Sequence, residues 1–228
     1  MIENVTNIIQ MIAAGLCAAI ALWNAHLSHK RTWVLLGLAA LIFFFGDLYW
    51  QFYLVFYGHT PQYSHIPYYS WYAYYVFLLL LIQALRDDRR ICKSRFLFII
   101  PLFTVGMCLF YMQWGDYVSN IISCFLMTFL LMNTSDGLTY IYSKKYKARW
   151  AEDDIYAAAG ASAQGERSAG MFYIVVLLAC LAEYGAWTSS VFFWQNYDSL
   201  ANPDYWFDTM TSVAFLLFIP ALRKAVGV

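Results

Sequence analysis

The sequence predicts an all-α integral membrane protein built as a bundle of seven transmembrane helices. Of its 228 residues, 62% are hydrophobic and only 12% are charged, whereas soluble domains have about 45–50% apolar and about 25% charged residues. Seven apolar segments have roughly the 20 residues that a membrane crossing needs. The 14 Lys and Arg residues all fall at or after the end of every second segment, counted from the first, which is typical of a multi-pass protein.

The seven predicted spans follow one another with mostly short connections. We expect them over residues 5–27, 33–57, 67–86, 95–114, 117–142, 170–194 and 205–225, in a single membrane domain that takes in residues 1–228. The first apolar run is long enough to cross a bilayer and shows no cleavage site of a short signal peptide, so we expect it to be retained as a helix. The long connection, 143–169, is predicted to be a cytoplasmic loop. Its second half, AAAGASAQGERSAG, is small and Gly-rich, which favours a flexible segment.

Lysine and arginine indicate the orientation of the bundle. They lie at or after the ends of the first, third, fifth and seventh spans, and they are Lys30, Arg31, Arg86, Arg89, Arg90, Lys93, Arg95, Lys144, Lys145, Lys147, Arg149, Arg167, Arg223 and Lys224. The connections on the other side, 58–66, 115–116 and 195–204, contain none. Basic residues stay on the cytoplasmic side. We therefore expect the N-terminus outside and the C-terminus inside a bacterial cytoplasmic (inner) membrane.

Two carboxylates stand inside apolar and aromatic runs. Asp47 lies in FFFGDLYWQFYLVFY and Glu183 in LACLAEYGAWTSSVFFW, while Asp208 lies near the start of the last span. A carboxylate in hydrocarbon costs a few kcal/mol or more, so such a residue marks a functional-site hypothesis. At 1.5 Å per residue, Asp47 lies about 20 Å above the cytoplasmic start of its span. All three acids are expected in the outer half of the bundle.

Aromatic residues share helix faces with these acids. Helical neighbours on one face are three or four residues apart, so the acids, phenols and indoles are expected to converge on one outer cavity. The predicted ligand-binding residues are Asp47, Trp50, Tyr57, Trp71, Tyr72, Tyr75, Glu183, Tyr184, Trp187 and Asp208. Such a group could hold a cation or amine by its charge and ring faces, or hold a polar head while stacking an apolar body. Alternatively, the rings form an interfacial belt without a ligand and the acids make structural hydrogen bonds between helices.

An internal repeat connects the two regions. A shift of 137 residues aligns the second and third spans with the sixth and seventh without a gap, and the matched pairs include Trp50–Trp187, Phe56–Phe193, Tyr68–Tyr205 and Val76–Val213. Asp47 and Glu183 are then one position out of register. Membrane proteins built from repeats tend to place their sites at the repeat interface, so we expect the site between spans 2, 3, 6 and 7.

Several kinds of chemistry have no signal in the sequence. There is no HExxH, GxSxG, P-loop or Rossmann motif, so we predict no catalytic residues, no metal and no cofactor. The formal net charge of zero gives no reason to expect a nucleic-acid partner. Five cysteines are scattered without a CxxC pair, so we interpret them as packing residues and predict neither a disulfide nor a zinc site.

The first of the two hairpins resembles a known sensory region. The run GDLYWQFYLVFYGHTPQYSHIPYYSWYAYYVFLLLL resembles the multi-span N-terminal sensory region of some bacterial membrane-anchored diguanylate cyclases. There, a Gly-Asp in one span is followed by a short outer loop and an aromatic-rich span. Trp71 departs from the pattern, because an Asp often stands there. A looser similarity, limited to Gly46-Asp47, is to the lysoplasmalogenase family of membrane hydrolases.

The second hairpin resembles the second copy in that sensory region. In the run AEYGAWTSSVFFWQNYDSLANPDYWFDTMTSVAFLLFIPALR, the pair Glu183-Tyr184 matches an acid-Tyr pair, and Asp208 matches the acid that opens the last span. The resemblance covers about half of the chain. It implies a sensory module, and with no output domain after Val228 we expect it to signal through a separate cytoplasmic or membrane partner.

These observations favour a membrane receptor that binds a small molecule or lipid and does not act as an enzyme. Two alternatives stay open. One is a lipid-acting membrane hydrolase with Asp47 and Glu183 as acid/base residues, and the other is a small transporter, which the repeat suggests.

Overall fold

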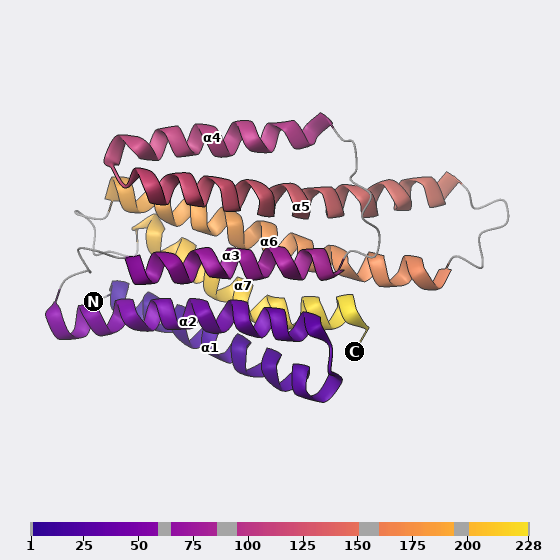
Figure 1. Cartoon of the computed structure of the whole chain (residues 1–228), viewed down its shortest axis with the longest axis horizontal. Coiled ribbons are helices and arrows are strands. Elements are labelled where there is room, and N and C mark those ends of the chain that lie inside the picture. The colour runs from indigo at the N-terminus through magenta and orange to yellow at the C-terminus, as the bar shows by residue number, and fades with distance from the viewer. Residues whose placement is uncertain (1, 59–64, 86–94, 151–159, 194–200, 228) are drawn as a thin grey trace.

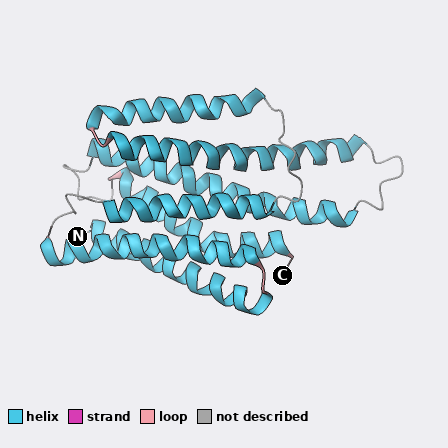
Figure 2. Ribbon diagram, in the orientation of Figure 1, coloured by secondary structure: helices cyan, strands magenta, loops and turns pink. Residues whose placement is uncertain are grey.

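The computed structural model describes residues 2–58, 65–85, 95–150, 160–193 and 201–227. In this part of the chain every regular element is a helix (Figure 2). The helices are α1 (Ile2–Ser28), α2 (Arg31–Tyr57), α3 (His65–Leu85), α4 (Ile99–Tyr111), α5 (Tyr117–Trp150), α6 (Gly160–Phe193) and α7 (Pro203–Val226). Short 3-10 turns, η1 (Arg95–Phe98) and η2 (Met112–Trp114), extend α4 at both ends. The predicted all-α class is confirmed.

Six of the helices are long and apolar enough to cross a membrane, as in a multi-pass membrane protein. They are α1, α2, α3, α5, α6 and α7, and the apolar helix over Ile99–Trp114 is shorter. The outer surface of the bundle carries large apolar side chains, among them Val55, Phe56 and Leu102, each at least 73% exposed. Exposed apolar area on this scale indicates contact with lipid.

The helices alternate in direction and pack as a closed circuit. Along it, α1 contacts α2, α2 contacts α3, α3 contacts α5, α5 contacts α6, α6 contacts α7, and α7 returns to α1. Helix α4 packs against α5 and forms the upper edge of the bundle in Figure 1. The two chain ends lie at opposite ends of the bundle (Figure 1). Helix α4 is therefore the outlying element.

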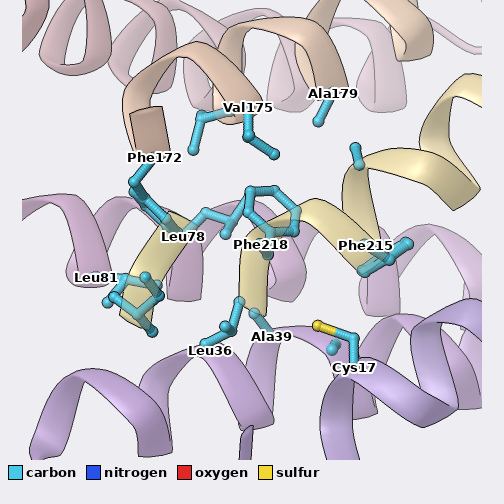
Figure 3. Close-up of a cluster of buried hydrophobic side chains, with 14 of the residues drawn as sticks. Cys17, Leu36, Ala39, Leu78, Leu81, Phe172, Val175, Ala179, Phe215 and Phe218 are labelled. Carbon is cyan, nitrogen blue, oxygen red and sulfur yellow. The ribbon is translucent and has the colours of Figure 1, made fainter. Parts of the chain in front are cut away.

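The core lies where α7 meets its neighbours. Phe218 sits at the centre of a cluster that takes apolar side chains from α1, α2, α3 and α6 (Figure 3). Next to it, the Phe215 ring lies 4.9 Å from the Phe43 ring, and Phe43 lies 5.1 Å from Tyr74. Aromatic pairs at such spacings contribute about 0.5–1.5 kcal/mol beyond their buried area. Asp47 follows Phe43 by one turn of α2, so the polar region begins directly beside this core.

The basic residues of the described helix ends gather at one end of the bundle, which we call the basic end. There, Lys30 and Arg31 lie in the α1–α2 turn, and Arg223 and Lys224 lie in the last turn of α7. The Lys30 ammonium donates a hydrogen bond to the carbonyl oxygen of Val226 at 2.6 Å, which ties the turn to α7. The opposite end holds the C-terminus of α2 and the N-terminus of α7.

The connection predicted over 143–169 differs from its expected form. Helix α5 continues to Trp150 and α6 begins at Gly160, so both sides of this connection are helical, and residues 151–159 lie outside the described part. The expected loop is therefore shorter than predicted, because its second half is helical from Gly160 onward. Its alanines, together with Gln164, Glu166 and Arg167, are good helix formers, which favours a helix although each glycine costs about 1 kcal/mol relative to alanine. Each of the two helices is 34 residues long, about 51 Å, whereas a bilayer core is about 30 Å thick.

Candidate functional site

Two polar clusters lie at the same level of the bundle. Asp47 stands ten residues before the end of α2 at Tyr57, and Glu183 stands ten residues before the end of α6 at Phe193. Tyr75 stands ten residues after the start of α3 at the same end. At 1.5 Å per residue, all three lie about 15 Å from the end opposite the basic one. The alternating helix directions bring these distant parts of the sequence to one depth.

The first cluster lies between α2 and α3 and is centred on Asp47. This side chain is only 9% exposed, and its Oδ1 accepts a long hydrogen bond of 3.5 Å from the indole Nε1 of Trp71. Gln51 is buried one turn further along α2. Within the described part of the chain, the Asp47 Oδ2 and the Gln51 Nε2 have no hydrogen-bond partner. A buried carboxylate with one long hydrogen bond carries an uncompensated desolvation cost, which a donor or cation would relieve.

The second cluster is a cavity between α3, α4, α5 and α6, which we call the Glu183 cavity. Its lining residues are Tyr75, Thr104, Cys108, Tyr111, Asn120, Ser123, Cys124, Met127, Glu183, Tyr184 and Trp187. The Tyr75 hydroxyl donates a hydrogen bond of 3.2 Å to the Glu183 Oε2. The cavity has a volume of about 20 Å³, which is enough for one water-sized group.

Hydrogen bonds between helices hold the walls of this cavity. The Tyr111 hydroxyl of α4 lies 2.8 Å from the Thr188 hydroxyl and donates to the Tyr184 carbonyl of α6 at 3.3 Å. Two turns away on the same face of α4, the hydroxyls of Thr104 and Thr128 are 2.6 Å apart. Helix α4 is thus fixed to both α5 and α6 by polar contacts. In lipid such contacts contribute to helix association, at about 0.6 kcal/mol each on average.

Helix α3 connects the two clusters. Trp71 and Tyr75 are one turn apart, and they contact Asp47 and Glu183 respectively. Glu183 and Asp208 lie close enough to Asp47 to repel it electrostatically. Within the described residues, no three His, Cys, Asp or Glu side chains are close enough together to hold a metal ion. The arrangement sets acidic side chains beside aromatic residues, and these are the two kinds of group that hold an organic cation in proteins.

The structure brings some of the predicted site residues together and separates others. Tyr75, Glu183, Tyr184 and Trp187 line the Glu183 cavity. Asp47 and Trp71 pair between α2 and α3, where the Trp50 ring lies 6.1 Å from that of Trp71. Of the other three predicted residues, Tyr72 is buried beside Ser123 of α5 and Tyr57 is exposed at the end of α2. Asp208 is half-buried on α7, within electrostatic range of Asp47.

The cavity differs from the expected interface of spans 2, 3, 6 and 7. It shares α3 and α6 with that interface, but it takes α4 and α5 in place of α2 and α7. Sequence reasoning missed the seven residues that α4 and α5 contribute, because they are uncharged. A usable signal was present, since Thr104, Cys108 and Tyr111 recur at helical spacing on α4, and Asn120 and Cys124 do so on α5.

Comparison of the chain with protein-family models, with curated proteins and with solved structures finds no match.

Proposed function

We propose that the chain is a seven-span sensory receptor of the bacterial inner membrane that binds an ammonium group in the Glu183 cavity. The ligand class is a small organic amine or the amine of a lipid headgroup. The N-terminus faces outward, and the signal passes to a separate cytoplasmic or membrane partner. The resemblance to the sensory region of diguanylate cyclases is part of this proposal.

The observation that carries the proposal is the Glu183 carboxylate in the wall of a polar cavity. One of its oxygens accepts a hydrogen bond from Tyr75, and the cavity also presents the rings of Tyr111, Tyr184 and Trp187. A cation is favoured by a carboxylate and by aromatic faces, and more strongly away from water. The small open volume admits the ammonium end of a ligand and excludes a drug-sized body, which needs about 300–1,000 Å³.

The count of seven spans is supported by the length of the α4 region. It has 13 α-helical residues between 3-10 turns of four and three residues. At about 1.5 Å and 2.0 Å per residue these add to about 33 Å, enough for a hydrocarbon core of about 30 Å. The orientation is supported by the alternation of the basic residues along the chain.

Signal transfer is supported by the two longest helices. Helix α5 contributes Asn120 to Met127 to the cavity wall, and α6 contributes Glu183 to Trp187. Both helices continue toward the basic end and are 34 residues long, so they extend about 20 Å beyond a bilayer core. A shift of either helix at the cavity would therefore be carried past the membrane, where a partner could sense it.

The proposal is tested by binding of ethylammonium to the purified protein in detergent. We expect Glu183→Gln to raise the dissociation constant at least tenfold, a loss of about 1.4 kcal/mol in binding free energy. The reason is that the neutral amide no longer offsets the charge of the ammonium group. Ethanol serves as the uncharged probe and should not bind. Thermal unfolding with and without ethylammonium measures the effect, since a ligand stabilises the folded state that binds it.

The matched control is Asp116→Asn, which removes an exposed carboxylate outside the cavity. It should leave the dissociation constant unchanged. Equal ethylammonium affinity in Glu183→Gln and the parent would refute the proposed site, as would an equal response to ethanol.

A small transporter is the second candidate, and a repeated packing detail favours it. A side-chain carbon at Gly46 would meet Ser70 of α3 at 2.8 Å, and one at Gly185 would meet the Phe207 ring of α7 still more closely. The 137-residue shift places Ser70 on Phe207 and sets Gly46 two positions before Gly185, so both hairpins make a close helix approach in the same region. Transporters are often built from such repeats. Accumulation of labelled ethylammonium inside liposomes would favour this candidate over a receptor.

A further inference from the structure

Two cysteines face each other across the α4–α5 contact. Helices α4 and α5 are consecutive and antiparallel, and the hydroxyls of Thr104 and Thr128 meet at 2.6 Å. One turn along each helix toward the α4–α5 connection, this register sets Cys108 opposite Cys124. The Cys108 thiol lies 3.5 Å from the carbonyl oxygen of Asn120, one turn before Cys124. Hydrogen-bond register and helix geometry therefore place both sulfur atoms at one point of the interface.

This pair differs in setting from the other described cysteines. Cys17 and Cys180 belong to the apolar core, whereas Cys108 and Cys124 both line the Glu183 cavity and interact with each other. Cys124 is partly exposed, and α4 carries exposed apolar side chains on its outer face, including Leu109. Cys124 lies seven residues from the start of α5, about 10 Å from the end opposite the basic one. A lipid-soluble reagent can reach this depth.

We propose that Cys108 and Cys124 are a reversible dithiol–disulfide site that cross-links α4 to α5 at the wall of the Glu183 cavity. The oxidant is a lipid-soluble two-electron acceptor of the quinone class. Two S–H bonds break and one S–S bond forms, and the two electrons and two protons pass to the quinone, which becomes a hydroquinone. Attack by a thiolate on the S–S bond reverses the cross-link.

The cross-link would act on the outlying helix of the bundle. Helix α4 packs mainly on α5 and supplies Thr104, Cys108 and Tyr111 to the cavity. A covalent bond at Cys108 fixes this wall and limits the room for a ligand. That consequence rests on the proposed function, whereas formation of the bond does not.

The site is tested by counting thiols in the full chain. The protein in detergent is reduced, freed of reductant and treated with tetramethylbenzoquinone, whose ring positions are all substituted against thiol addition. It is then unfolded in SDS, alkylated with N-ethylmaleimide and weighed intact. We expect three maleimides in place of five, and a return to five after treatment with dithiothreitol. Chymotryptic peptides cut between residues 108 and 124 should stay joined until reduction.

Variants identify the thiols that react. The variant Cys108→Ser has four thiols, and all four should still react with maleimide after treatment with the quinone. If the serine disturbs folding, Cys108→Ala takes its place with the same expected result. In the matched control Cys180→Ser, the count should fall from four to two. Five maleimides after oxidation of the parent, peptides that are not joined, or an undiminished loss in Cys108→Ser would overturn the proposal. None of these results depends on ethylammonium binding, so the two proposals fail separately.

Discussion

At the scale of single residues, the structure separates two carboxylates that the sequence presents as near-equivalents. Glu183 lines a cavity and accepts a hydrogen bond from Tyr75. Asp47 is packed between α2 and α3, where Trp71 reaches only one of its oxygens. A buried carboxylate with a poor hydrogen-bond complement is expensive to keep, so removing its partner and removing the charge should have different effects.

The Asp47–Trp71 contact can be measured with a double-mutant cycle. Trp71→Phe removes the indole donor and should destabilise the fold, with a coupling free energy to Asp47→Leu of about 0.6 kcal/mol and no more than about 1.7 kcal/mol. Circular dichroism during unfolding in detergent gives the four free energies. Trp50→Phe, a change in the adjoining ring, is the matched control and should couple weakly to Asp47→Leu. Equal coupling in both cycles would mean that the hydrogen bond contributes nothing.

At the scale of helices, small residues inside and large apolar residues outside explain the packing. Helix α1 buries Ala14, Ala18 and Ala21 against its neighbours and exposes Ile12 and Leu16. In a bilayer there is no hydrophobic drive between helices, so close backbone approach supplies the association energy. The same principle explains Gly46, which lets α2 approach α3 directly beside Asp47.

Adding a single methyl group at Gly46 should test the close contact between α2 and α3. In Gly46→Ala, the new carbon would lie 2.8 Å from the Cβ of Ser70, which side-chain rotation cannot move away. We expect a loss of about 1–3 kcal/mol in the free energy of unfolding from overpacking. The matched control is Gly106→Ala on α4, where no described atom lies within 4 Å of the new carbon. It should be neutral or stabilising by up to about 1 kcal/mol, because alanine has the higher helix propensity. Unfolding in detergent measures the free energy of unfolding of both variants. Equal stability of the two variants would contradict the close α2–α3 contact.

At the scale of the whole molecule, the alternation of helix directions places the described basic residues at one end. The turn containing Lys30 and the last turn of α7 meet there. If this end faces the cytoplasm, the Glu183 cavity lies nearer the outer surface, where an extracellular amine or an outer-leaflet headgroup could enter. The side of the membrane on which each end lies therefore decides which ligands reach the site.

Cysteine labelling in intact cells tests this orientation in a background without the five native cysteines. A cysteine at Tyr117, which is exposed at the start of α5, should react with a membrane-impermeant maleimide added from outside. A cysteine at His29, exposed in the α1–α2 turn, should react only after permeabilisation. The reverse pattern would invert the orientation, and reaction of both from outside would be incompatible with α4 completing an odd number of crossings.

The sequence by itself determined the all-helical architecture with apolar, span-length helices, the positions of the helices to within a few residues at most ends, and the similar height of Asp47 and Glu183 along the bundle. These follow from apolar length and helical rise, which are local properties of the chain. Only the tertiary structure decided that α4 and α5 complete the cavity and that Cys108 faces Cys124. Uncharged residues such as Thr104 and Asn120 carry no sign of burial cost. Their helical spacing places them on one face of each helix, but only the packing of neighbouring helices decides that these two faces meet at the cavity.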